Sequence, residues 1–171
     1  MAQFTQQGPK LVGGGAVGNA FQGSVALSAD GNTAIIGGDN DSAAVGAAWA
    51  FTRSAGVWSQ LGPKLVGSGA VGNAAQGVSV ALSADGNTVI IGGSYDNGEA
   101  GAAWVFIRRC RLWTQMGGKL VGSGAIGGAQ QGQSVALSAD GNTAIVGGIN
   151  DNNNAGAVWV FVKHGWGSVL P

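Results

Sequence analysis

Acidic residues recur at fixed places in this chain and are the first candidates for chemistry. Two sets have equal spacing: Asp30, Asp85 and Asp140, then Asp41, Asp96 and Asp151. The first set lies in Ala-Asp-Gly-Asn segments, each offering one carboxylate, whereas calcium takes about six to eight oxygen ligands, often several from one loop. The Asp-Gly pair is typical of a tight hairpin turn, because glycine adopts positive φ without steric cost. We therefore expect turns here, with no metal and no cofactor.

Other reactive side chains are few. Cys110 is the single cysteine, which excludes an internal disulfide and a cysteine-based zinc site. His164 is the single histidine, and no nucleophile or acid pair recurs beside it, so a hydrolytic triad has little support. Arg108, Arg109 and Arg111 flank Cys110, a pattern that favours a solvated hairpin over an anion site. We predict that the chain is not an enzyme and keep catalysis as the third hypothesis.

The composition indicates an all-β protein. Of 171 residues, 34 are glycine, 45% are hydrophobic and only 9% are charged, against about 25% charged in an average domain. The formal net charge of zero gives no field that would favour nucleic acid as a partner. No apolar run approaches the roughly 18 residues that span a bilayer, so we expect no membrane insertion. The first residues, Met-Ala-Gln-Phe, do not resemble a signal peptide, and the compartment stays undetermined.

One unit is repeated three times at intervals of 55 residues, as Trp49, Trp104 and Trp159 show. In the middle copy we expect four antiparallel strands: Val78–Ser83, Thr88–Gly93, Gly101–Ile107 and a strand that begins at Trp113. The continuous apolar run of the second predicts burial on both faces. Alternation in the third places Trp104 and Phe106 on one face and Ala103 and Val105 on the other.

The repeated pattern "VALSADGNTAIVGG", followed by "GAVWVF" and, in complete copies, by "W-x-Q" and "KL", resembles the FG-GAP repeat family. That family includes the integrin α-subunit propeller and many bacterial surface proteins. The resemblance covers about Phe4 to Phe161 and implies a β-propeller with an adhesive or ligand-binding role, secreted or at a bacterial cell surface. Members that bind calcium carry alternating aspartates where this chain has Ser28-Ala29-Asp30, so we do not transfer that function.

We therefore predict one repeat domain forming a β-propeller of three four-stranded antiparallel blades, at about 4–56, 57–111 and 112–163, with a degenerate tail at 164–171. The third copy lacks a fourth strand, and the N-terminal segment Phe4–Gly13 matches the missing sequence. Three blades are too few, since propellers have about four to eight. A homodimer would give six blades, each N-terminal strand completing a blade of the partner. The alternatives are a single-chain β-prism or β-trefoil with pseudo-threefold symmetry, or a piece of a longer array.

The loops between the second and third strands of each copy are predicted to share one rim with the glycine-rich connectors between copies. Their amide, carboxylate and aromatic side chains suit a carbohydrate or protein ligand, although Asn, Asp and Gly also form ordinary solvated turns. The candidate ligand rim comprises Asp41, Asn73, Gln76, Tyr95, Asp96, Asn97, Glu99 and Asp151. A recognition or adhesion module is the leading hypothesis, and a purely structural, self-assembling propeller fragment is the second.

Overall fold

The computed structural model describes residues 1 and 3–164 of the chain. It is an all-β structure, with 7% of its residues in helices and 42% in strands. Three antiparallel sheets follow one another along the sequence, and within each sheet the strands pair in chain order.

The first sheet contains β1 (Gln22–Leu27), β2 (Thr33–Gly38), β3 (Ala47–Ser54) and β4 (Val57–Gln60). The second contains β5 (Ser79–Leu82), β6 (Thr88–Gly93), β7 (Ala102–Arg109) and β8 (Leu112–Gln115). The third contains β9 (Ser134–Leu137), β10 (Thr143–Gly148) and β11 (Ala157–Val162). A single helical turn joins the second and third strands of each sheet: α1 (Asp41–Ala44), α2 (Asp96–Glu99) and α3 (Asp151–Asn154).

The middle sheet has the four antiparallel strands expected from the sequence pattern, but β8 ends at Gln115, well before Lys119, which was expected to lie on it. The apolar strand β6 is buried along its whole length, as an uninterrupted run of Val, Ile and Gly predicts. On β7, Trp104 and Phe106 belong to the core between the first and second sheets. Ala103 and Val105, which alternate with them, belong to the core between the second and third sheets. The period of two along β7 therefore supplies two cores from one strand.

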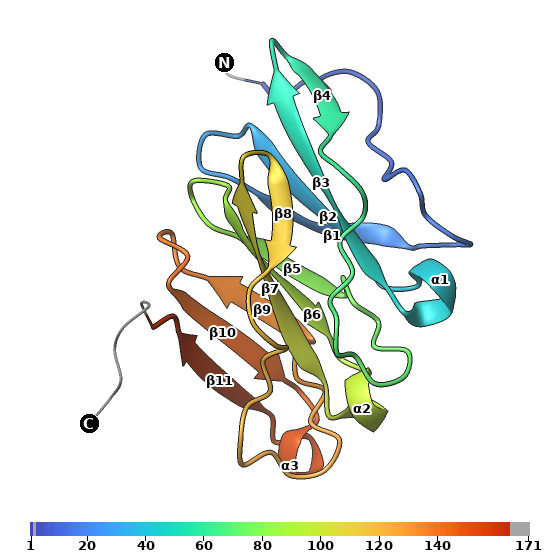
Figure 1. Cartoon of the computed structure of the whole chain (residues 1–171), viewed down its shortest axis with the longest axis vertical. Coiled ribbons are helices and arrows are strands. Elements are labelled where there is room, and N and C mark those ends of the chain that lie inside the picture. Colours follow the sequence, from blue (N-terminus) through green and yellow to red (C-terminus); the bar gives the residue numbers. More distant parts are fainter. Residues whose placement is uncertain (2, 165–171) are drawn as a thin grey trace.

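The sheets pack face to face in a row. Figure 1 shows the first sheet near the N-terminus, the second in the middle and the third near the C-terminus, with α1, α2 and α3 along one side. The apolar clusters between neighbouring sheets form the core, and none of the three sheets closes into a barrel. The propeller predicted from the repeats is thus not closed within the described part of this chain, which forms a three-sheet row.

Both ends of the row expose apolar side chains that are buried at the equivalent places inside it. Ile35 and Ile90 are 0% exposed because the next sheet covers them, but Ile145 on the third sheet is 41% exposed. At the other end, Val25 of the first sheet is 71% exposed, whereas its counterpart Val80 is 9% exposed. Each end of the row therefore leaves exposed part of the surface that elsewhere joins one sheet to the next, although the N-terminal connector covers Trp49 on the first sheet.

The third sheet ends at β11, and no fourth strand pairs with it among residues 1 and 3–164. The segment Phe4–Gly13, which matches β4 and β8 in sequence, forms no strand in this chain, and residues 3–10 are exposed. The observed sheets also divide the chain differently from the predicted ranges, since β4, within the range 57–111, pairs with β3. Trp166 and the rest of 165–171 lie outside the described residues.

No helix in the described ranges is both long and apolar enough to cross a membrane.

Candidate functional site

The side of the molecule that carries α1, α2 and α3 forms the rim predicted from the loop order (Figure 1). The glycine-rich connectors run beside these turns, as expected. In the middle of the row, the backbone N–H of Asn97 donates to Val71 O at 2.9 Å and that of Tyr95 donates to Ala74 O at 3.2 Å. The connector from Val71 to Ala74 therefore lies against α2, and the polar residues of both segments share one surface.

The three turns have an unusual backbone. In α2, Asn97, Gly98 and Glu99 all have positive φ, between 51° and 71°. The equivalent residues of α1 and α3 do the same. This is a left-handed turn, a conformation that non-glycine residues adopt at a cost of roughly 1–2 kcal/mol each. Contacts of neighbouring side chains must hold the turn in place, and the sequence pattern of Asp, Asn and Gly indicated a loop but not this geometry.

A buried aspartate anchors each turn to the connector beside it. Asp96 is 1% exposed, and its Oδ1 accepts a hydrogen bond of 2.7 Å from the backbone N–H of Val71. Its Oδ2 accepts a charge-assisted hydrogen bond from Lys119, which follows β8. Asp41 makes the same two contacts, with Val17 and Lys64.

The third anchor is incomplete. Asp151 accepts a 2.7 Å hydrogen bond from the N–H of Ile126 but has no lysine partner among the described residues.

The hydrogen bonds to Asp41 also lower its pKa. Burial alone would raise the pKa of Asp41, but the hydrogen bonds from Lys64 and from Val17 hold it below its usual value. The three aspartates predicted as ligand-rim residues thus accept hydrogen bonds from backbone N–H groups of the same chain and hold the turns against the connectors.

Position 43 offers a direct test of the left-handed turns. Ala43 has a φ of 57°, and the equivalent residue of the middle turn is Gly98. We expect Ala43→Gly to raise the free energy of unfolding by about 0.5–1 kcal/mol, because glycine removes the Cβ strain. The reverse change, Gly98→Ala, should lower it by a similar amount. Urea denaturation of both variants measures this, and equal destabilisation by the two changes would contradict the turn geometry.

Gln76, another predicted rim residue, is buried in the connector. Its Oε1 accepts a hydrogen bond from the N–H of Gly67 at 2.5 Å, and its Nε2 donates to Gly67 O at 2.9 Å. Gln22 and Gln131 bind Gly13 and Gly122 in the same way. These glutamines therefore pin the connectors, and their recurrence before a glycine in each copy was the sequence signal for that role.

Four of the predicted rim residues face solvent, and all lie beside the second sheet. Tyr95 is 50% exposed, and the other three are exposed polar side chains: Asn73, Asn97 and Glu99. Glu99 Oε2 accepts a 3.0 Å hydrogen bond from Gln130 of the next connector. The accessible part of the predicted rim therefore consists of an aromatic ring, two amides and a carboxylate around α2.

The Asp-Gly-Asn segments are turns at the opposite ends of β2, β6 and β10. In the middle copy, Asp85 Oδ1 accepts hydrogen bonds from Ser83 Oγ at 2.6 Å and from the N–H of Asn87 at 3.0 Å. The serine hydroxyl also accepts from the N–H of Thr88 at 2.9 Å, which links the two strands. Within the described ranges, no three His, Cys, Asp or Glu residues form a group that could hold a metal ion.

These turns give the protein an acid-sensitive element. Hydrogen bonds from Ser28 and Asn32 lower the pKa of Asp30 to about 2, and the pKa values of Asp85 and Asp140 fall for the same reason. Because folding lowers these pKa values below about 3.9, their stabilising effect is present above that pH and is lost as the pH falls toward 2. Thermal melts from pH 6 to pH 2 should show this loss, and replacing all three aspartates by asparagine should flatten the profile. A wild-type profile without a fall below pH 4 would contradict the assignment.

The arginine-rich hairpin is also structural. Arg108 lies over the ring of Trp113 at 5.6 Å and donates to Asn87 Oδ1 at 2.9 Å. Arg53 makes the equivalent contacts with Trp58 and Asn32 in the first sheet. Cys110 is exposed at the hairpin tip, where its φ is 48°. The recurrence of the arginine contact explains one of the three arginines that flank this cysteine.

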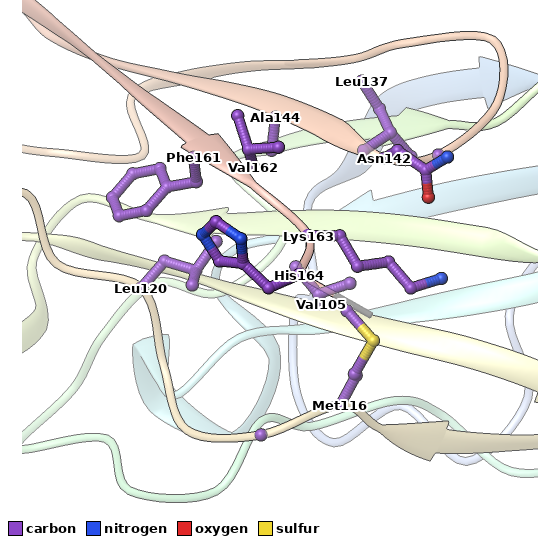
Figure 2. Close-up of a pocket in the computed structure, with 12 residues that line it drawn as sticks. Val105, Met116, Leu120, Leu137, Asn142, Ala144, Phe161, Val162, Lys163 and His164 are labelled. Carbon is purple, nitrogen blue, oxygen red and sulfur yellow. The ribbon is translucent and has the colours of Figure 1, made fainter. Parts of the chain in front are cut away.

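An apolar groove of about 410 Å³ lies between the second and third sheets, and sequence reasoning missed it. Figure 2 shows His164 at this groove among Phe161, Leu120 and Met116, with Lys163 beside them. The signal that could have located it is the absence, after β11, of a residue equivalent to Trp113.

Comparison of the sequence with protein-family models and with curated proteins finds no match.

Proposed function

We propose that the chain is a noncatalytic recognition module, built as half of a six-bladed β-propeller that a second copy completes. The FG-GAP resemblance and the three repeated sheets support the propeller. The exposed ends of the row support the second copy, since a contiguous apolar surface on a protein marks an interaction site. Three sheets from each of two chains bring the ring into the range of about four to eight blades.

The observation that carries the recognition role is the rim around α2. Its buried aspartate accepts a hydrogen bond from Val71 and so holds the turn against the connector, which places the exposed side chains of both segments on one surface. The side chains that it presents, Tyr95, Asn97 and Glu99 with nearby Asn73, combine an aromatic face with hydrogen-bonding groups. This combination suits a neutral, hydroxylated ligand such as a glycan, or a polar protein surface.

The noncatalytic part of the proposal rests on how the polar residues are used. The recurring aspartates and glutamines form their hydrogen bonds with backbone groups and lysines of the same chain. The repetition of these contacts in each copy supports a role in folding, because three copies of one structural unit need the same ties.

Tyr95 allows a matched test, since asparagine stands at the equivalent positions, Asn40 and Asn150. Binding of the intact chain should be measured on a glycan array and repeated with Tyr95→Asn. A saturable signal that falls at least tenfold in the variant, with an unchanged melting temperature, would support recognition by this rim. A signal that Tyr95→Asn leaves unchanged would overturn it.

A purely structural propeller unit is the second candidate, and the uncovered ends of the row favour it. It requires association but no ligand. An assembly of defined mass with no saturable binding to glycans or proteins would replace the recognition role by this one.

A further inference from the structure

Among the described residues no strand pairs with the outer edge of β11, and this edge and the groove beside it have a matching segment elsewhere in the chain. We propose that they bind residues 4–11 of a second copy, which adds the fourth strand to the third sheet. This inference rests on the proposed association of two copies and assigns the site at which they are joined.

The first two sheets supply the register. Phe106 pairs with Gln115, Ile107 with Thr114 and Arg108 with Trp113, and the first sheet repeats these pairs 55 residues earlier. Carried to the third sheet, the register pairs Phe161 with Gln6, Val162 with Thr5 and Lys163 with Phe4 of the second copy. Lys163 then takes the place of Arg108 beside an aromatic ring.

The groove matches the position of that aromatic ring. Trp113 packs against the core between the first and second sheets. Six residues of that core have counterparts 55 residues later that line the groove: Val105, Met116, Leu120, Leu137, Ala144 and Phe161. Phe4, which is 105% exposed in the single chain, occupies the sequence position of Trp58 and Trp113. The groove therefore lies where Trp113 packs in the preceding sheet, and Phe4 of the second copy fills it.

Beyond the groove, the third sheet also offers a backbone pairing position for Leu11 of this segment. Leu65 and Leu120 each exchange two hydrogen bonds, of 2.7–3.0 Å, with Ala48 and Ala103. The equivalent residue of the third sheet is Val158, 65% exposed, and the equivalent leucine is Leu11. Leu65 makes two contacts at once: its backbone pairs with Ala48 of the first sheet, and its side chain packs on the second sheet. Leu11 already packs in the same way on the first sheet, so its backbone could pair with the third sheet of a partner. When residues 4–11 move to the partner, Leu11 can keep its place on the first sheet, whereas Gln7 gives up the 3.1 Å hydrogen bond that it accepts from Arg53 in the single chain.

Charge complementarity fixes the orientation. Asp41 pairs with Lys64 and Asp96 with Lys119, in each case 23 residues apart. Asp151 has no lysine partner in the described chain, and Lys10, at the position of Lys64 and Lys119, has no acidic one. Asp151 of one copy and Lys10 of the other would therefore form the ion pair that Asp41 and Asp96 form within the chain.

Cross-linking with matched cysteines tests the register. On a Cys110→Ser background, a Thr5→Cys chain and a Val162→Cys chain are unfolded and refolded together, then treated with a short bis-maleimide. A linked pair is expected, because directly opposed residues have Cβ atoms about 4.5–5.5 Å apart. Ser59→Cys is the control: it holds the same strand position as Thr5 but pairs with Thr52 of its own chain. It should give no link to Val162→Cys.

Two substitutions at Phe4 and two at Lys10 test the contacts separately. Phe4→Ala and Lys10→Met should each weaken association about tenfold, while Phe4→Trp and Lys10→Arg should retain it. A chain that is dimeric by mass but gives no Thr5–Val162 link would overturn this inference and leave the proposed association standing. A chain that stays monomeric would overturn both. Equal linking of the Ser59 control would also overturn the register.

Discussion

Replacing Gly67 with alanine is expected to lower the free energy of unfolding by about 3 kcal/mol. Gly67 lies against the indole of Trp104, and a Cβ at this position would approach the ring carbons closer than 3.0 Å. Trp104 is fully buried in the core between the first two sheets and cannot move away without disturbing it. Gly13 and Gly122 have the same relation to Trp49 and Trp159, so the connector glycine is a packing requirement of each copy.

Gly118 provides the control for this change. A Cβ at Gly118 would meet no atom within 4 Å, and its φ is not in the left-handed region. Gly118→Ala should be neutral or slightly stabilising, because alanine restricts the unfolded chain. Guanidinium denaturation of the two alanine variants gives the comparison. Similar stabilities for Gly67→Ala and Gly118→Ala would show that the tryptophan is not packed against the connector.

The second large effect is expected for Gln76→Ala, which should also cost about 3 kcal/mol. The change removes both hydrogen bonds to Gly67 and leaves a backbone N–H and a backbone C=O without their partner. Gln76 is 0% exposed, so water cannot replace the lost contacts without opening the connector.

Gln133→Ala is the matched comparison, since the side chain of Gln133 makes no hydrogen bond among the described residues and is partly exposed. Its effect should stay within about 0.5 kcal/mol. Chemical denaturation followed by tryptophan fluorescence measures both variants. If Gln76→Ala lowers the free energy of unfolding no more than Gln133→Ala does, the structural role assigned to Gln76 is wrong, and its side chain is available to a ligand as the sequence predicted.

The strands could be read from the sequence because their signals are local. Alternation of Trp104 and Phe106 with Ala103 and Val105 was sufficient to predict that the two pairs lie on opposite faces of β7, and each face is buried in a separate core. The Asp-Gly pairs were sufficient to predict turns at the ends of the strands.

The candidate site was harder to predict, because its residues act through contacts across the fold. Asp41 and Asp96 recur in polar loops, as ligand-binding residues would, yet both are buried against lysines 23 positions away in the chain. The left-handed turns also escaped prediction, since Ala43 has no local preference for positive φ and adopts it under tertiary constraint. What could be predicted was the shared rim, and within it the structure leaves Tyr95, Asn97, Glu99 and Asn73 accessible.

Within residues 1 and 3–164 no fourth strand follows β11, and the proposed assembly follows from this feature. It links the sequence of the N-terminal segment to the exposed ends of the row and to Asp151, which has no lysine partner in the part of the chain that the structure describes. A prism or trefoil with pseudo-threefold symmetry would bury these surfaces within one chain, whereas the described residues leave Ile145 and Val158 exposed.

The most direct test is the mass of the unmodified chain in solution, measured by light scattering over a range of micromolar concentrations. Two copies that share their end sheets and N-terminal strands should give about twice the 16.7 kDa of one chain. A mass of 16.7 kDa across that range would show that a single chain is soluble with its outer sheets uncovered or covers them itself, and would contradict the six-bladed ring.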